Sequence, residues 1–250
     1  MFGLDKPLGL TSLQALDALR AADPSLRDRR LGHAGRLDPM AEGLLTVLVD
    51  DETRDAPTLR TQDKTYEIDV ALGVATDSFD SFGLVTELVP DIALDDDAFA
   101  RACLRWEGVV AQRYPPFSQA RVDGRSLLAW GAAGVTMERP VATRTVTAIT
   151  VLGRRAEPGE AIVAEAVRRA GLVRGELRQE AIAARWRARE GELAGRTVPV
   201  VSLRVACSAG TYMRSLAFDL GAAVGAPSIA WRIRRTRAGA LRVEDARRLP

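Results

Sequence analysis

A single aspartate on a glycine-bracketed turn is the feature of this sequence with the clearest potential for chemistry. Asp38 lies within residues 32–43, which read GHAGRLDPMAEG, and it directly precedes Pro39. The proline disfavours helical backbone for the residue before it, so we expect an extended acid at the rim of a turn. The only histidine of the chain, His33, lies just upstream. The same residues would also suit an aspartate that merely caps a helix, with Pro39 at the first helical position. This segment alone leaves both interpretations open.

The motifs of several other enzyme classes are missing from the sequence. A serine hydrolase would need a histidine near a Gly-x-Ser-x-Gly elbow, which does not occur. A zinc deaminase would need His-x-Glu with Pro-Cys-x-x-Cys, and a phosphate-binding loop would need Gly-x-x-x-x-Gly-Lys; neither pattern occurs. We therefore expect no metal, nucleotide cofactor or redox group. A carboxylate with arginines and aromatic residues can still perform covalent catalysis of the kind used on glycosidic bonds.

Length and composition indicate one large domain. The chain has 250 residues, of which 47% are hydrophobic, enough for a sizeable core. No apolar run approaches the roughly 20 residues that cross a bilayer, and we expect no signal peptide. Cys103 and Cys207 form no Cys-x-x-Cys pair and no disulfide framework. A cytoplasmic protein that acts as a monomer fits this composition.

Arginine supplies nearly all of the positive charge. The net charge of +2 does not by itself demand a polyanion, but Lys6 and Lys64 are the only lysines among 35 basic residues, which leaves 33 arginines. A GC-rich genome would explain most of this count, although arginine also forms paired hydrogen bonds with phosphates and stacks on bases. One C-terminal cluster resembles a strip that tracks a phosphate backbone. Its members are Arg232, Arg234, Arg235, Arg237 and Arg242.

The elements that must position the acid are predicted from hydrophobic periodicity. Residues 44–49 are almost wholly apolar and indicate a buried strand soon after the aspartate. In residues 66–74, apolar side chains occupy every second position. This alternation indicates a half-buried strand that carries Tyr66. Acids at 95–97 suit the N-terminus of a helix. Another helix begins at Thr11 or Ser12, and its predicted apolar stripe is Leu13, Leu16 and Leu19.

The segment 154–196 differs in composition from the rest of the chain. It holds ten arginines and seven glutamates with alanine-rich helical spacing, and it predicts a helical hairpin inserted into a β connection. We expect its charges to form a solvated face, with RNA contact as the weaker alternative. Beyond it, alternation up to Cys207 indicates a strand, and a Ser-Ala-Gly turn then leads into a helix that begins near Tyr212 and Arg214.

Several segments together match the pattern of one family. They are residues 4–12 (LDKPLGLTS), 32–43, 63–66 (DKTY), 72–80 (LGVATDSFD), 108–124, 207–221 and 233–237 (IRRTR). On these segments the sequence resembles the bacterial tRNA pseudouridine synthase B family (TruB), whose members isomerise the T-loop uridine (U55) of tRNA. The segments occur in family order and cover nearly the whole chain outside residues 154–196.

The resemblance implies an architecture and a partner. The fold would be an α+β pseudouridine synthase fold, with a curved, mostly antiparallel mixed sheet flanked by helices. Residues 1–250 would form a single catalytic domain with the helical insertion 154–196 and without the C-terminal RNA-binding domain (PUA) of many relatives. The partner would be the T arm of tRNA, and neither a cofactor, a membrane nor an obligate protein partner is implied.

The resemblance also implies roles for individual residues. Asp38 would be the nucleophile, Tyr66 would lie against the target base, and Arg214 would pair with Asp38 from the opposite side. Among the residues expected to contact the RNA, the histidine would assist entry of the flipped nucleotide, and one tyrosine and one isoleucine would line the pocket. These residues are His33, Tyr212, Ile233, Lys6, Lys64, Arg234 and Arg235.

These parts suit such a reaction on physical grounds. A stacked uridine must be extruded at a cost of about a few kcal/mol, and stacking on an aromatic ring returns about 1–3 kcal/mol per base. An arginine beside the acid keeps it ionised despite burial. Without the resemblance, Tyr66 would be read as a core aromatic and Arg214 as a locally paired residue. Whether Asp38 attacks the ribose C1′ or uracil C6 stays open. A non-catalytic tRNA-binding module of the same fold and a synthase for another RNA are the alternative functions.

Overall fold

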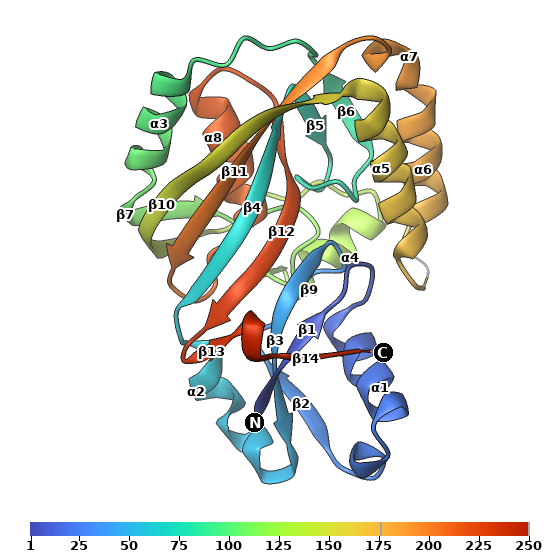
Figure 1. The fold of residues 1–250 in the computed structure, drawn as a ribbon, viewed down its shortest axis with the longest axis vertical. Coiled ribbons are helices and arrows are strands. Elements are labelled where there is room, and N and C mark those ends of the chain that lie inside the picture. The colour runs from blue at the N-terminus through green and yellow to red at the C-terminus, as the bar shows by residue number, and fades with distance from the viewer. Residues whose placement is uncertain (176, 250) are drawn as a thin grey trace.

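One large sheet runs through the protein, for which the computed structural model describes residues 1–175 and 177–249 (Figure 1). Within these residues the sheet has ten strands, eight of them in one continuous path. The order is β14 (Arg247–Arg248), β1 (Phe2–Lys6), β3 (Ala41–Val49), β12 (Ser228–Ala238), β4 (Lys64–Leu72), β11 (Thr197–Cys207), β10 (Val141–Pro158) and β7 (Gly108–Arg113). Off this path, β2 (Leu31–Ala34) pairs with β3 and β13 (Leu241–Arg242) pairs with β12.

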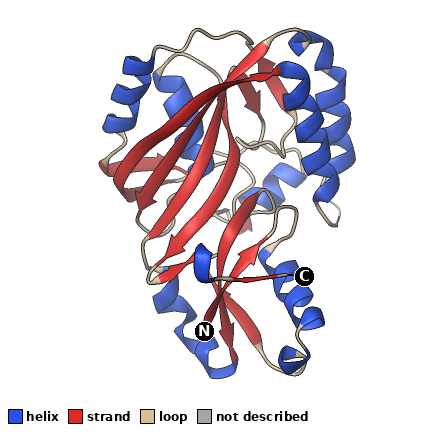
Figure 2. Ribbon diagram, viewed as in Figure 1, coloured by secondary structure: helices blue, strands red, loops and turns tan. Residues whose placement is uncertain are grey.

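The sheet is mixed and mostly antiparallel. Only β1 with β14 and β3 with β12 are parallel neighbours in the described residues. Helices lie on both sides of the strands (Figure 2), which confirms the predicted α+β class. The helices are α1 (Ser12–Ala22), α2 (Ala56–Arg60), α3 (Asp96–Arg105), α4 (Leu127–Ala132), α5 (Gly159–Leu172), α6 (Gln179–Ala188), α7 (Glu190–Leu193) and α8 (Met213–Ala223). Short 3-10 turns occupy Pro24–Leu26, Asp50–Asp55 and Val243–Asp245.

The two faces of the sheet carry separate hydrophobic cores. On β4, Val70 and Leu72 belong to the core that α1, α3 and α8 cover, whereas Ala71 between them belongs to the core under α5 and α6. This alternation follows from the two-residue period of a strand. The strand signal at 66–74 is therefore confirmed, but both faces of this strand are covered. Gly73 ends β4 in a left-handed conformation (φ 91°) that glycine adopts readily.

A β-bulge in β12 decides which face receives Ile233. Ala230 pairs with Val70 and Arg232 with Asp69, so Trp231 is the extra residue between two successive partners. A bulge of this kind reverses the alternation of side chains beyond it. Trp231 consequently belongs to the core under α5 and α6, while Ile233 packs in the core that α8 covers.

The predicted insertion is a helical hairpin between two neighbouring antiparallel strands. Strand β10 ends at Pro158, which is paired with Thr197 at the start of β11, and α5, α6 and α7 fill the connection. Its apolar side chains do more than support a solvated face, because they form a buried core against the sheet together with β5 (Val74–Thr76) and β6 (Val85–Leu88). The core residues of the insertion are Ile162, Val163, Ala166, Ala170, Ile182, Ala183, Trp186 and Leu193.

The N-terminal helix begins as predicted but turns a different face to the core. Thr11 is its N-cap, and the side chain of Gln14 completes a capping box. Leu13, however, is 64% exposed, while Ser12, Ala15, Leu16 and Leu19 are buried. The predicted stripe was wrong at Leu13, because a period of 3.6 residues aligns positions 12, 15, 16 and 19.

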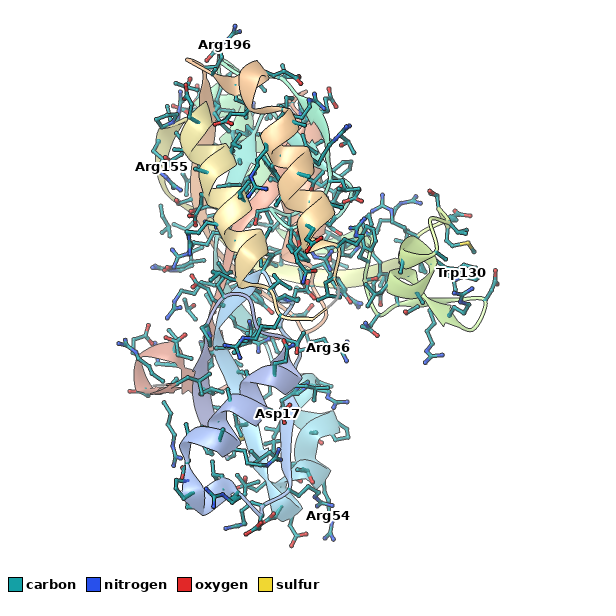
Figure 3. The ribbon with its side chains drawn as sticks, turned by 90° about the vertical axis from the view of Figure 1, so that its right-hand side faces the viewer. Asp17, Arg36, Arg54, Trp130, Arg155 and Arg196 are labelled. Atoms are coloured by element: carbon teal, nitrogen blue, oxygen red, sulfur yellow. The ribbon has the colours of Figure 1, made fainter. Side chains whose placement is uncertain are left out.

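A small segment stands apart from the body. It contains α4 and the two-stranded pair β8 (Arg121–Val122) and β9 (Arg125–Ser126), and the guanidinium of Arg125 lies 4.3 Å from the ring centre of Trp130. Figure 3 shows this segment with Trp130 projecting to one side of the molecule. In the described part of the chain, no helix has both the length and the apolar character that a membrane crossing requires.

We predict that the core of the insertion contributes to the stability of the whole fold. Trp186 on α6 is fully buried and meets Trp231 of β12 edge-on, with ring centres 6.3 Å apart. Trp186→Ala should lower the free energy of unfolding by about 3–5 kcal/mol, because it leaves a large cavity. Urea titration measures this loss. Arg187→Ala on the exposed side of the same helix is the control, with an expected change within about 0.5 kcal/mol. A loss from Trp186→Ala no larger than that of the control would refute the prediction.

Candidate active site

The loop that carries Asp38 is fastened to the N-terminal segment on both sides of the acid. Leu37 N–H donates to Ser12 Oγ (2.9 Å), and the same hydroxyl donates to the Leu37 carbonyl oxygen (3.2 Å). Beyond the acid, the Gly9 N–H donates to the carbonyl oxygen of Pro39 (2.8 Å). Asp38 is not a helix cap, because strand β3 rather than a helix begins at Ala41, whose N–H donates to the Asp38 carbonyl (3.0 Å). The loop presents Asp38 with 37% of its side chain exposed.

Arg214, which lies on α8 and far from Asp38 in the sequence, forms an ion pair with it. Its Nη2 lies 2.9 Å from Asp38 Oδ2, and only 4% of the arginine side chain is exposed. The same guanidinium donates through Nη1 to the carbonyl oxygens of Ser78 (3.0 Å) and Pro116 (2.9 Å). Fixed partners on several sides leave the guanidinium one orientation, and the charge-assisted bond to Asp38 is of the strong kind.

A second carboxylate lies on the other side of Arg214. Asp80 Oδ2 is 3.7 Å from Arg214 Nε, and Asp80 is buried. Burial raises the pKa of Asp80, whereas the charge of Arg214 and the hydrogen bond from Ser78 lower it. The Ser78 hydroxyl (2.6 Å) and the Phe82 N–H (2.9 Å) both donate to Asp80 Oδ1. Asp38 and Asp80 thus share one buried arginine. Asp80 is buried, whereas Asp38 is partly exposed to solvent.

Two tyrosines lie within the electric field of Asp38. Burial raises the pKa of Tyr66 and of Tyr212, and the charge of Asp38 adds to both shifts. Tyr66 stands on β4 at the centre of the sheet, paired with Val205 and next to Arg235 of β12. Both phenols are therefore neutral aromatic surfaces near the acid rather than bases.

Tyr212 is held in place by a buried amide. The Tyr212 N–H donates to Gln112 Oε1 (2.8 Å), and Gln112 Nε2 donates back to the Tyr212 carbonyl (3.1 Å). Gln112 itself is 2% exposed. The ring of Tyr212 packs against Tyr114, with centres 5.3 Å apart. This arrangement fixes the N-cap of α8 and so fixes Arg214 two residues later.

Three of the basic residues predicted to contact RNA are buried instead. Lys6 is fully buried, and its ammonium donates to the carbonyls of Pro7 (2.8 Å) and Leu10 (2.7 Å). Lys64 donates to the carbonyls of Arg60 (2.6 Å) and Gln62. Burial lowers the pKa of each lysine to about 8. Both ammonium groups are thus bound to backbone carbonyls, an arrangement that favours a structural role over the predicted contact with RNA.

Arg235 is the third of these residues, and its guanidinium serves the Asp38 loop. It is 1% exposed and donates to the carbonyl oxygens of Gly35 (3.0 Å) and Leu44 (2.7 Å). Gly43 lies beside it with φ 93°, and a Cβ there would come within 2.4 Å of the Arg235 carbonyl oxygen. Arg235 thus binds the loop to β12, which favours a structural role over the predicted contact with RNA.

The remaining predicted residues lie at the edges of this site. Arg234 is half-buried and pairs with Asp5 (2.9 Å), so it does not form a free phosphate contact. Ile233 is 6% exposed and packs in the same core as Leu37. His33 on β2 lies within the field of a different set of charges, those of Arg36, Arg60 and Arg235. Together the structure unites Asp38, Tyr66, Tyr212 and Arg214, and leaves His33 to one side.

Sequence reasoning missed several residues on which this geometry depends. Asp80 and Gln112 were recognised only as members of matching segments, without a role. A buried arginine demands more than one acceptor, and that requirement could have pointed to Asp80. Ser12 was read only as a possible helix cap. In residues 1–175 and 177–249, no three side chains of His, Cys, Asp or Glu gather closely enough to hold a metal ion.

Comparison with known proteins identifies the family of this chain. The family described as "TruB family pseudouridylate synthase (N terminal domain)" matches residues 24–172. The tRNA pseudouridine synthase B of Corynebacterium aurimucosum is 33% identical over 243 residues, which cover 97% of this chain and 68% of that protein. The tRNA pseudouridine synthase B of Burkholderia mallei (strain NCTC 10247) is 32% identical, and the match covers 65% of its length. The chain thus spans about two thirds of these relatives.

Solved structures share the fold. A crystal structure of a Cbf5-Nop10-Gar1 complex matches 99% of this chain and 51% of its own chain, with a TM-score of 0.62 and 23% identity. A structure of an H/ACA RNP bound to a substrate RNA containing 2'-deoxyuridine matches with a TM-score of 0.59, 22% identity and coverage of 99% of this chain and 50% of that one. The fold is that of the pseudouridine synthases. The chain belongs to the TruB family of pseudouridylate synthases.

We predict that His33 makes the fold sensitive to mild acid. Burial, followed by the charges of Arg36, Arg60 and Arg235, lowers the pKa of His33 to about 4 from 6.5. Between these values the unfolded chain binds a proton that the folded chain does not, so this residue's contribution to stability is lost as the pH falls from 6.5 to 4. His33→Asn should therefore lose less stability than the wild type over that interval, as measured by urea titration. Equal losses in both proteins would contradict the prediction.

Proposed function

We propose that this protein is a tRNA pseudouridine synthase that converts the T-loop uridine (U55) to pseudouridine with Asp38 as its nucleophile. The observation that carries the proposal is the ion pair between Asp38 and Arg214. A partly open carboxylate whose charge is held by a buried arginine suits covalent attack, whereas RNA binding alone has no use for such a pair.

In the proposed reaction, the Asp38 carboxylate attacks the flipped nucleotide at either ribose C1′ or uracil C6. The bond between N1 and C1′ then breaks, the uracil turns within the site, and C5 forms the new bond to C1′. Departure of the carboxylate, loss of the C5 proton to solvent and uptake of one proton by N1 complete the isomerisation. Atoms and electrons balance without a cofactor, since the product is an isomer of the substrate.

The neighbouring side chains have separate tasks in this scheme. Arg214 keeps Asp38 ionised and oriented, and Asp80 supplies a second acid that compensates the buried guanidinium. Tyr66 and Tyr212 offer aromatic surfaces for the uracil, which must leave its stack to reach the acid. His33, whose imidazole stays neutral above about pH 4, can fill the space that the base vacates.

Recognition of the tRNA backbone falls to exposed arginines rather than to the buried lysines. Arg36 and Arg60 are exposed, and the charges of both act on His33. Figure 3 shows Arg36 on the side of the body from which the α4 segment projects. A T arm that enters from this side would meet these guanidinium groups, which bind phosphate through paired N–H groups.

The test is release of tritium from C5-labelled tRNA transcripts. The wild type should release tritium, and Asp38→Asn should reduce the rate by about a thousandfold or more, since the amide cannot act as the nucleophile. Binding of tRNA, measured by filter retention, should change by no more than about twofold because the amide keeps the shape of the acid.

Asp17→Asn is the matched control. Asp17 is an exposed acid on α1 that pairs with Arg20, so the same chemical change there should leave the rate unaltered. Equal release by wild type and Asp38→Asn would remove Asp38 from the nucleophile role. Tight tRNA binding by a wild type that releases no tritium would instead favour a non-catalytic binding module. A transcript with cytidine at the T-loop position should release no label above background.

A further inference from the structure

The helical insertion sends one arginine toward the site. Arg178 is the residue directly before α6, and its Nη1 lies 2.8 Å from Asp77 Oδ2. Its guanidinium carbon lies 4.2 Å from the centre of the Phe117 ring. Asp77 and Phe117 are far apart in sequence and belong to two different loops, so one side chain of the insertion contacts both.

The first of these loops holds Arg214 through the residue next to Asp77. The carbonyl oxygen of Ser78 accepts from Arg214 Nη1 (3.0 Å), and the Ser78 hydroxyl donates to Asp80. Asp77 is also tied to the far end of the same turn, because its Oδ1 accepts from Leu84 N–H (2.9 Å). Arg178 therefore binds this loop at Asp77, one position before the residue whose carbonyl accepts from Arg214.

The second loop holds Arg214 through the residue before Phe117. The carbonyl oxygen of Pro116 accepts from the same Arg214 Nη1 (2.9 Å). The Phe117 ring also lies against α4, where a Cβ on Gly131 would come within 2.6 Å of it. Contacts with Arg178 and with α4 thus fix the Phe117 ring. The position of the adjacent Pro116 carbonyl is fixed along with it.

Several arginines of the insertion contact other elements, among them Arg155, Arg185 and Arg196, but their partners lie outside the two loops that hold Arg214. Arg168 pairs with Glu165 of its own helix, and Arg189, which directly precedes α7, pairs with Glu192 of α7, as expected for a solvated face. Arg178 instead reaches across 101 residues of sequence to Asp77, with 33% of its side chain exposed. Its backbone is left-handed (φ 67°), a conformation that a side chain other than glycine adopts at a cost. These features favour a structural connection to the site over a contact with RNA.

We propose that Arg178 is a positioning residue for the isomerisation. It joins the two loops whose carbonyls hold Arg214, and it thereby fixes the direction in which that guanidinium meets Asp38. This inference rests on the proposed function, but it assigns to the insertion a role in that site. The guanidinium of Arg178 pairs with Asp77 and stacks its face on Phe117. Both contacts at once require a planar cation, which lysine lacks.

The experiment compares Arg178→Ala with Arg168→Ala in the full chain. Arg168→Ala also removes an ion pair of the insertion, but one that contacts neither loop. Single-turnover tritium release from C5-labelled tRNA gives the rate of the chemical steps, and filter retention gives tRNA affinity. Hydrogen exchange of residues 76–80 and 114–118 reports the order of the two loops independently of activity.

We expect Arg178→Ala to lower the single-turnover rate by about tenfold with tRNA affinity unchanged, because a small misplacement of a catalytic group is costly. Exchange in both loops should become faster, and Arg168→Ala should match the wild type in all three measurements. Arg178→Lys should recover only part of the rate, since it keeps the charge beside Asp77 but not the contact with Phe117.

Three outcomes would overturn the inference. They are a rate for Arg178→Ala within about twofold of the wild type, a loss confined to tRNA affinity, and an equal loss in Arg168→Ala. The second outcome would mean that Arg178 contacts RNA instead. Failure of the proposed function is distinct from all three, because in that case the wild type itself would release no tritium.

Discussion

The buried guanidinium of Arg214 is the constraint around which the site is built. Removal of such an ion from water costs several kcal/mol unless its hydrogen bonds and charge are compensated. Two carbonyls and two carboxylates provide that compensation here, and they come from three separate loops: that of Asp38, that of Ser78 and Asp80, and that of Pro116. The two acids are not equivalent, since Asp38 is 37% exposed at its side chain and Asp80 only 9%. The sealed acid balances the arginine, so the open one stays available for chemistry.

Buried cations also determine the shape of the loop that carries Asp38. Lys6 binds carbonyls of residues 7 and 10, which lie against the loop, and Arg235 binds carbonyls on either side of the acid. Backbone carbonyls in a turn have no strand partner, and an enclosed N–H donor satisfies them without water. The cost of burying the lysine is visible in its pKa of about 8. The buried positive charge near Asp38 therefore supports the backbone of the loop.

Sequence patterns were sufficient for the fold class, the hairpin insertion and the pairing of Asp38 with Arg214, because these follow from periodicity and from matching segments. They were not sufficient for the basic residues. The sequence around a lysine at the end of a strand does not show whether its ammonium faces solvent or a set of backbone carbonyls. For Lys6, the path of residues 7–10 determines that the ammonium is enclosed. The face on which Ile233 lies was equally hidden, since it depends on the bulge at Trp231. The prediction that Leu13 faces the core was wrong for a simpler reason. An apolar residue at the start of a helix can stay exposed at little cost in free energy.

The helical hairpin between β10 and β11 leaves the register of the sheet intact. It enters after Pro158 and leaves before Thr197, and these residues are paired neighbours, so the strands on either side keep their partners. The ends of the inserted segment are held together by the sheet itself, and the entropy of closing a longer connection grows only slowly with its length. Its apolar side chains then bury a face of β12 and β11 that would otherwise need other cover. Once the hairpin was anchored in this way, the start of α6 lay beside the loops at 77–80 and 116–117. Arg178 at that position contacts Asp77 and Phe117, and so connects the hairpin with both loops.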